Sequence, residues 1–193
     1  MANEITPEMV EVARQEGKEP EEICELVSQG RAVIARNQIR KNVRPVGIGA
    51  GLKVKVNANI GTSMDLCDLE MELKKLRAAE DAGADTVMDL STGGDITAIR
   101  REILKATTLP LGTVPIYQAA IDTVRKGKAF VYMSGSDLFS VIKKQAEDGV
   151  DFITVHCGVT LESVSRLKKE GRILDVVSRG GALMVEWMDF NEK

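Results

Sequence analysis

The sequence of 193 residues is poor in side chains that bind metals or stack on nucleic-acid bases. It has three cysteines, one histidine and only 4% aromatic residues. Cys24, Cys67 and Cys157 lie far apart and none belongs to a C-x-x-C pair, so the cysteine spacing of a zinc knuckle or an iron–sulfur loop is absent. One histidine cannot form a metal site by itself, and the shortage of aromatic residues argues against a base-stacking surface.

Long apolar runs and basic blocks are also missing. No stretch of 18 apolar residues occurs, so no transmembrane helix is expected, and residues 1–12 are acidic where a signal peptide would be basic and then apolar. The net charge is −3, and the basic pairs Lys143–Lys144 and Lys168–Lys169 are isolated on helical stretches. We therefore expect a cytoplasmic protein with reduced cysteines, and neither nucleic acid nor membrane as a partner.

The first 50 residues differ in pattern from the rest. Thr6-Pro7-Glu8 has the cap, proline and acidic residue that begin a helix, and Glu19-Pro20 begins a second helix that Gln29-Gly30 ends. Residues 36–45 are polar and basic, which is typical of a connection. We expect residues 1–50 to form a small helical and extended N-terminal segment, followed by one domain over residues 51–193.

From Gly51 onward, apolar strands alternate with helices of apolar period three and four. The strands are predicted at 54–57, 86–88, 109–116, 152–155 and 173–177, and residues 130–133 form either a loop or an extra strand. This alternation implies a parallel sheet with right-handed crossovers, as in a doubly wound sheet or a barrel. Similar turns at 81–85 and 148–151, and no G-x-G-x-x-G after the first strand, favour the barrel. We therefore expect an α/β fold, a partial (β/α)8 barrel of about five βα units.

Each predicted strand ends in polar residues, and active sites of α/β barrels lie at the carboxyl ends of strands. Asn57 and Asn59 could recognise a polar heterocycle or a ribose, or could fix the loop before Gly61. Asp89, with Ser91 and Thr92, could hold a sugar or cap the helix that follows. Both alternatives stay open at each position.

The later strand ends carry residues suited to a ring and an anion. Tyr117 could stack on a ring or pack under a loop, and His156 is either a ligand-binding or a structural histidine. In Ser178-Arg179-Gly180-Gly181, the glycines permit close backbone approach and Arg179 offers a forked cation to a phosphate or carboxylate. Together these ends predict a small-molecule site.

Several of these segments are long enough to carry a family resemblance. The segments Asn57–Gly61 (NANIG), Ala84–Gly93 (ADTVMDLSTG), Gly112–Gln118 (GTVPIYQ) and Ser178–Gly181 (SRGG) resemble the phosphomethylpyrimidine synthase (ThiC) family. The resemblance extends from about Ile5 to the last residues. It implies a radical S-adenosylmethionine lyase that converts 5-aminoimidazole ribotide into hydroxymethylpyrimidine phosphate for thiamine, using S-adenosylmethionine, a [4Fe–4S] cluster and zinc.

The resemblance also implies which residues bind the substrate. By their place in the family motifs, these are Asn59, Met88, Tyr117, His156, Ser178, Arg179 and Gly180. The family's C-x-x-C-x-x-x-x-C motif, its metal-binding histidines and its Asp-Gly-Leu-Arg segment do not occur in these 193 residues. We therefore expect these residues alone to hold no cluster, S-adenosylmethionine or zinc, to be inactive by themselves, and to include no catalytic residue that can be assigned.

The same observations suggest how such a chain would exist. We expect a truncated portion of the synthase that forms a homodimer or larger oligomer, because the edge strands of a partial barrel would otherwise stay unpaired. The alternatives are a non-catalytic paralogue that binds the ribotide, and a relative that makes 5-hydroxybenzimidazole from the same substrate.

Overall fold

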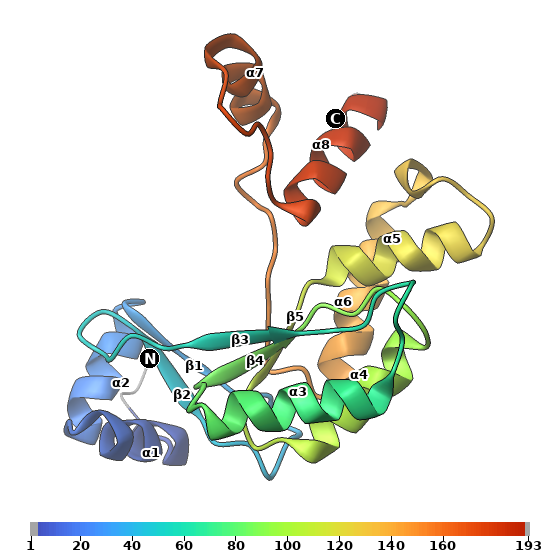
Figure 1. Cartoon of the computed structure of the whole chain (residues 1–193). Coiled ribbons are helices and arrows are strands. Elements are labelled where there is room, and N and C mark those ends of the chain that lie inside the picture. Colours follow the sequence, from blue (N-terminus) through green and yellow to red (C-terminus); the bar gives the residue numbers. More distant parts are fainter. Residues whose placement is uncertain (1–3, 192–193) are drawn as a thin grey trace. The chain divides into compact units, whose positions relative to one another are not determined.

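The computed structural model describes residues 4–191. The chain divides into two compact units, which can be followed by colour in Figure 1. Unit 1 comprises residues 1–113 and 146–152, and unit 2 comprises residues 114–145 and 153–193. The boundary expected at residue 50 lies inside unit 1 and stays a prediction. No helix within residues 4–191 combines the length and apolar character needed to cross a bilayer.

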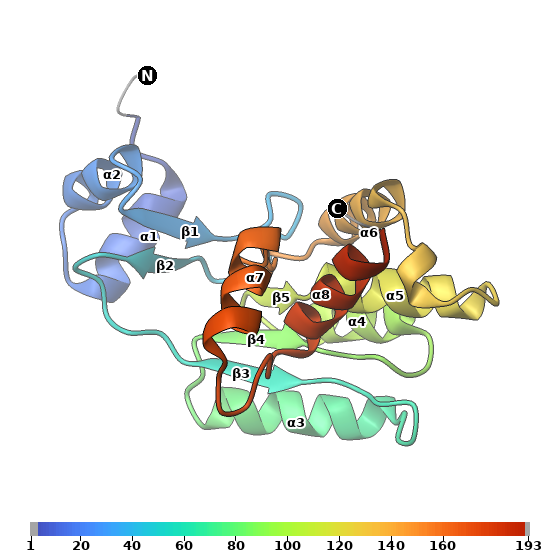
Figure 2. The ribbon, with the colours of Figure 1, turned by 90° about the horizontal axis from the view of Figure 1, so that it is seen from above.

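The N-terminal part of unit 1 has two helices packed on a two-stranded antiparallel sheet (Figure 2). The elements are α1 (Pro7–Glu16), α2 (Pro20–Ser28), β1 (Ala32–Ala35) and β2 (Val46–Gly49). Thr6 accepts a hydrogen bond from the Met9 amide at 3.3 Å, so the predicted cap of the first helix is confirmed. Val12 and Ile23 pack against Ile34 of β1. The two strands were not predicted, because short strands with one buried face carry no long apolar run.

A four-stranded parallel sheet is the centre of unit 1, in the order β3-β4-β5-β6 (Figure 1). The strands are β3 (Asn57–Ile60), β4 (Thr86–Asp89), β5 (Leu111–Thr113) and β6 (Phe152–Ile153). Helices α3 (Leu69–Asp81) and α4 (Ile96–Ala106) cover one face of it. Leu76 and Ile103 from these helices form one core with Ile60, Val87 and Leu111 of the strands.

The predicted alternation of strands and helices is largely confirmed, but the strand boundaries differ. The third strand ends at Thr113 because Pro115 begins a helix, where its missing N–H group is not needed. The strand predicted at 173–177 is wrong, since this segment contains no strand and Ile173 is fully exposed. Within residues 4–191 the sheet is open, so the fold seen is mixed α/β with a parallel sheet and no closed barrel.

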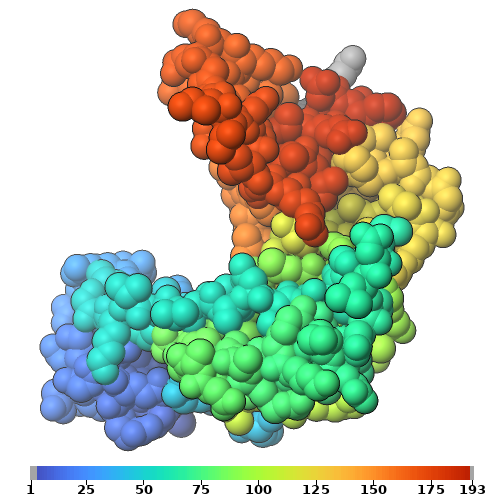
Figure 3. Space-filling model, in the orientation of Figure 1, coloured from blue at the N-terminus to red at the C-terminus, as the bar shows by residue number. Residues whose placement is uncertain are grey.

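Unit 2 is mainly helical. Its helices are α5 (Pro115–Arg125), η1 (Phe130–Tyr132), α6 (Gly135–Asp148, whose last turn belongs to unit 1), α7 (Leu161–Glu170) and α8 (Arg179–Asn191). The Trp187 indole of α8 donates to the Met133 carbonyl at 2.7 Å, and Phe190 meets the Tyr132 ring edge to face at 5.1 Å. Helix α7 buries no residue, and Figure 3 shows its side chains (orange) at the surface. The open alternative at 130–133 is resolved as a single 3₁₀ turn.

A buried ion pair joins four segments of unit 1. Arg40, expected in a polar, basic connection, is only 7% exposed and pairs with Asp151, whose side chain is fully buried. The Arg40 guanidinium also donates to the carbonyls of Thr107 at 2.7 Å and Leu109 at 3.1 Å. The Asp151 carboxylate accepts from the backbone amides of Asn37 at 2.7 Å and Leu111 at 2.8 Å. Almost every polar atom of the pair is therefore satisfied inside the protein, which is what makes the burial of two charges tolerable.

Asp151→Asn should lower the free energy of unfolding by about 3–5 kcal/mol, because it leaves a buried guanidinium without its counter-charge. The measurement is urea unfolding followed by circular dichroism. The control is Arg166→Ala, which removes an exposed helical pair with Glu162 at 2.9 Å and should cost at most about 0.5 kcal/mol. Equal losses in the two variants would contradict the role given to Asp151.

Candidate functional site

The sheet face not covered by α3 and α4 carries two of the predicted ligand-binding residues. Side chains alternate along a strand, so Asn57 and Asn59 of β3 point away from the core that Ile60 joins. Parallel pairing places Asn57 beside Thr86 and Asn59 beside Met88 of β4. The structure therefore brings Asn59 and Met88 together as neighbours on one face of the sheet, where Asn59 is exposed and Met88 is buried.

Hydrogen bonds connect the polar side chains of this face. The Thr86 hydroxyl donates to Asn57 Oδ1 at 2.8 Å, and Asn57 Nδ2 donates to Asn59 Oδ1 at 3.0 Å. Asn57 thus binds a side chain and not the loop before Gly61, which was the structural alternative considered from the sequence. Sequence reasoning did not single out Thr86, although its register beside Asn57 follows from the pairing of the two strands.

An aromatic residue that sequence reasoning also missed lies further along the same face. Gly112 of β5 pairs with Met88, and a Cβ atom at Gly112 would lie 2.3 Å from the Phe152 ring. The ring therefore rests directly on the glycine backbone. The signal available in the sequence was the glycine itself, because a glycine inside a strand often marks a close approach.

Asp89 at the end of β4 and Ser91 just after it stabilise the loop that follows the strand. Asp89 is buried and accepts hydrogen bonds from the Ser91 amide at 2.9 Å and from its hydroxyl at 2.5 Å, while the Ser91 hydroxyl accepts from the Thr62 amide. Burial raises the pKa of the Asp89 carboxyl above its ordinary value, and the Ser91 hydrogen bonds and the Arg100 charge oppose this only in part. Asp95, not Asp89, caps α4 through the Ala98 amide. These contacts make Asp89 and Ser91 structural in this fold.

Unit 2 gathers the other five predicted residues. His156 Nε2 lies 3.1 Å from Ser178 Oγ, which also accepts from the Gly181 amide at 3.2 Å and so caps α8. The imidazole rests on Gly180, where a Cβ atom would lie 2.0 Å from His156 Cε1. Although the strand predicted before Ser178 is absent, the cap of α8 holds this residue beside the histidine.

Arg179 and Tyr117 complete this group. The Arg179 guanidinium lies over the Tyr117 ring, with 5.3 Å between its carbon and the ring centroid, which is a cation–π contact. Tyr117 lies in the first turn of α5, where its backbone amide donates a hydrogen bond to the Val114 carbonyl at 3.0 Å. A cation, a hydroxyl, an imidazole and the amides of a helix start therefore converge, which suits an anionic or hydroxyl-bearing ligand.

The comparisons with known proteins agree with the resemblance found in the sequence. Residues 1–193 match the model of the radical SAM ThiC family. The chain belongs to this family.

Curated relatives of this ThiC-family chain carry the name phosphomethylpyrimidine synthase. The chain is 54% identical to that of Desulforudis audaxviator over 189 residues, which is 98% of this chain and 44% of the relative. It is 53% identical to that of Moorella thermoacetica over 190 residues, again 98% and 44% of the two chains. For Methanopyrus kandleri the identity is 52% over 178 residues, 92% of this chain and 42% of the relative. The chain therefore spans less than half the length of these curated relatives.

The cofactors that the family name implies can be tested against the residues present. A [4Fe–4S] cluster needs several thiolates close together, but Cys24 is buried in α2 while Cys67 and Cys157 are exposed in separate segments. Among residues 4–191 no group of three or more His, Cys, Asp or Glu side chains is placed to hold a metal. The described residues therefore do not fit the cluster, and no chemical step is derived through it.

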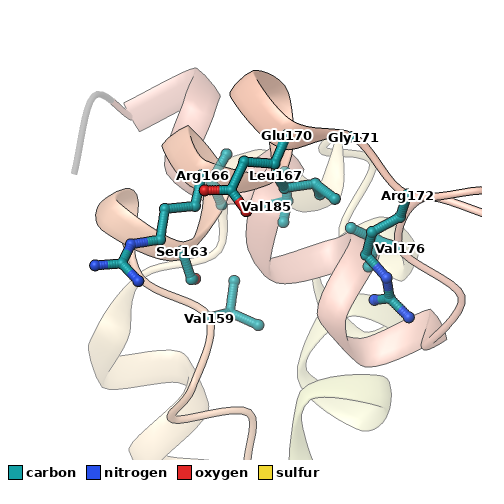
Figure 4. Close-up of a pocket in the computed structure, with 10 residues that line it drawn as sticks. Val159, Ser163, Arg166, Leu167, Glu170, Gly171, Arg172, Val176 and Val185 are labelled. Carbon is teal, nitrogen blue, oxygen red and sulfur yellow. The ribbon is translucent and has the colours of Figure 1, made fainter.

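A pocket of about 330 Å³ lies elsewhere in unit 2, between α7 and α8 (Figure 4). Its lining combines apolar residues with charged ones on α7 and just after it: Val159, Ser163, Val164, Arg166, Leu167, Glu170, Gly171, Arg172, Val176 and Val185. None of the seven predicted ligand-binding residues lines it. This pocket reflects the loose packing of α7, which buries no residue.

Gly180→Ala should displace the His156 imidazole, because the new methyl group would overlap the ring. The chain has one histidine, so a single Hε1 resonance in a ¹H–¹³C spectrum reports on it. We expect a clear shift of that resonance in Gly180→Ala. Gly135→Ala, where nothing lies within 4 Å of the added carbon, should leave it in place. An identical spectrum for both variants would contradict the packing of His156 on Gly180.

Asp89→Asn should gain stability relative to the parent as pH rises. With a raised folded pKa, Asp89 loses its proton first in the unfolded chain, so parent stability falls as pH rises above about 3.9 toward the folded pKa. Thermal unfolding from pH 3 to 7 measures the difference between the two proteins. A difference independent of pH would contradict the buried carboxyl.

Asp148→Asn is the control of opposite sign. Burial by itself raises the pKa of Asp148, but hydrogen bonds from Arg100 at 2.6 Å and Arg101 at 2.8 Å lower it overall. That stabilisation is present above the unfolded pKa and is lost as pH falls through the folded pKa. Asp148→Asn should therefore lose stability relative to the parent as pH rises over the acid range.

Proposed function

We propose that this chain is the substrate-binding part of a phosphomethylpyrimidine synthase that acts on 5-aminoimidazole ribotide in thiamine pyrimidine biosynthesis. The observation that carries the proposal is the convergence of Tyr117, His156 and Ser178–Gly180 in unit 2. These residues come from three separate segments, and the family resemblance names them all as ligand-binding. Identities above 50% to curated synthases support the same assignment.

The chemistry of the unit 2 group suits the polar end of a ribotide. The N-terminus of α8 supplies backbone N–H groups and the favourable end of a helix dipole for an anion. Arg179 adds a positive charge, and Gly180 lets the His156 ring lie directly on the backbone at the helix start. The Ser178 hydroxyl and the His156 imidazole can each donate or accept a hydrogen bond. We propose that these groups bind the phosphate and hydroxyl portion.

On the open face of unit 1, we propose that Asn59 and Met88 contact the ribotide. Asn59 is an exposed carboxamide with hydrogen-bonding capacity, and Met88 offers a polarisable apolar surface beside it. In a (β/α)8 barrel helices cover one face of the parallel sheet, the other face turns inward, and ligands bind at the carboxyl ends of the strands. We propose accordingly that the open sheet is a portion of such a barrel.

In the proposed role, the 193 residues bind substrate and do not complete the reaction. The family uses S-adenosylmethionine and an iron–sulfur cluster to supply radical chemistry. The described residues do not fit the cluster. We therefore expect no product from these 193 residues alone, even with S-adenosylmethionine, iron, sulfide and reductant present.

Calorimetric titration with 5-aminoimidazole ribotide tests the proposal. Arg179→Ala should weaken binding by about 10-fold or more, since a hydrogen bond to a charged group contributes ~1.5–3 kcal/mol. Asn59→Ala should weaken it by about 3- to 10-fold, the range of one neutral hydrogen bond. Arg166→Ala, an exposed arginine of α7 outside the group, is the matched control and should bind as the parent does. Unchanged affinity in both site variants, with a parent that binds, would overturn the assignment of these residues.

A further inference from the structure

We infer that Asn57 and Thr86 are positioning residues that orient the Asn59 carboxamide, so that Asn59 presents its NH₂ group to the ligand. The inference rests on the proposed function, in which Asn59 contacts the ribotide. It adds two residues that do not themselves need to touch the ligand. It also names the kind of ligand atom that this NH₂ group recognises, which is a hydrogen-bond acceptor.

The hydrogen bonds from Thr86 through Asn57 to Asn59 all donate in one direction. Thr86, only 3% exposed, donates its hydroxyl to Asn57 Oδ1 at 2.8 Å. This contact turns the other end of the Asn57 amide, Nδ2, toward Asn59 Oδ1 at 3.0 Å. The chain therefore runs from a hydroxyl through one amide to the oxygen of the next. The oxygen of Asn59 therefore accepts one hydrogen bond, from Asn57.

The Asn59 side chain keeps hydrogen-bonding groups that the chain of bonds does not use. Within residues 4–191 the Asn59 NH₂ group has no protein partner, and Asn59 itself is exposed on the open face of the sheet. The Asn59 oxygen keeps a second lone pair, but the two N–H donors are the groups that this hydrogen-bond chain leaves open. The ligand atoms that match these donors in an aminoimidazole ribotide are the unsubstituted ring nitrogen and the ribose oxygens.

The geometry of strands β3 and β4 creates this arrangement. Asn57 and Asn59 are two residues apart, so their side chains share a face, while Ala58 between them turns to the helix-covered core. Parallel register sets Thr86 directly beside Asn57. The hydrogen bond between the two carboxamides is exposed and contributes little to folding stability. The Thr86 hydroxyl is buried, so Thr86→Val is expected to lower stability modestly, and its binding is measured well below its unfolding transition.

Titration of the purified protein with 5-aminoimidazole ribotide tests the inference. Thr86→Val keeps the shape but removes the hydroxyl, and we expect binding to weaken about 3- to 10-fold, the range of one neutral hydrogen bond. Thr86→Ser keeps the hydroxyl and should restore affinity to within about 2-fold of the parent. Asn57→Asp can only accept, so it should turn Asn59 round to present its oxygen and weaken binding by at least as much as Thr86→Val.

The double variant separates orientation from general damage. If Thr86 acts through Asn59, Thr86→Val should cost nothing further once Asn59→Ala is present. A purely structural role would instead add its loss in full. Thr123→Val removes another buried hydroxyl, one that bonds the Ala119 carbonyl of its own helix, and should change neither binding nor the double-variant result.

A second readout needs no ligand. In a ¹H–¹⁵N spectrum the side-chain amide resonances of Asn57 and Asn59 should shift in Thr86→Val, and that of Asn59 should shift in Asn57→Asp. Both should stay in place in Thr123→Val. Parent-like binding by Asn59→Ala would overturn the proposed contact of Asn59 with the ribotide. Weakened binding by Asn59→Ala with parent-like binding by Thr86→Val and Asn57→Asp would overturn the positioning role alone. Additive losses in the double variant would overturn it as well.

Discussion

The buried pair of Arg40 and Asp151 holds unit 1 together at the point where its sequence is most discontinuous. Asp151 lies in the short segment 146–152 that rejoins unit 1 after more than thirty intervening residues. Its carboxylate binds the start of β5 and the Asn37 amide, and Arg40 binds the carbonyls that follow α4. A pair of buried charges costs desolvation energy, so it persists only where hydrogen bonds satisfy it as fully as these do.

This anchor determines the sheet face on which the candidate ligand-binding residues stand. With β5 fixed at Leu111, its register places Gly112 beside Met88, and Met88 in turn lies beside Asn59. The Phe152 ring, one residue after Asp151, then rests on Gly112. The segment 146–152 thus supplies both Asp151 of the ion pair and Phe152, the aromatic residue beside the open face.

Unit 2 achieves its arrangement by different means. Its candidate residues are held by a helix cap, a ring packed on a glycine and a cation–π contact, with no buried ion pair among them. Such contacts are individually weak, in the range of about 0.5–2 kcal/mol. Exposed apolar side chains on Ile173, Leu174 and Val177 show that the segment before α8 has little packing of its own within the described residues. Ligand binding is therefore expected to order this group further.

The sequence by itself determined most of the helices, the alternation of strands and helices, and the family. Apolar periodicity predicted α3 and α4, the Thr6 cap marked α1, and the motifs around Asn59, Met88 and Tyr117 placed the chain in its family, which the family match confirms. These signals are local, because helix periods, caps and contiguous motifs depend on neighbours in the chain.

Only the tertiary structure decided how distant residues meet. The sequence placed Arg40 in a polar, basic connection, predicted a strand before Ser178 that does not exist, and left Asp89 open between ligand binding and structure. Arg40 is buried through its pairing with Asp151, which lies 111 residues away in the sequence. No local pattern encodes such a contact. The hydrogen bonds that orient Asn59 likewise depend on strand register. Register is set by the packing of the whole sheet and not by the residues of one strand.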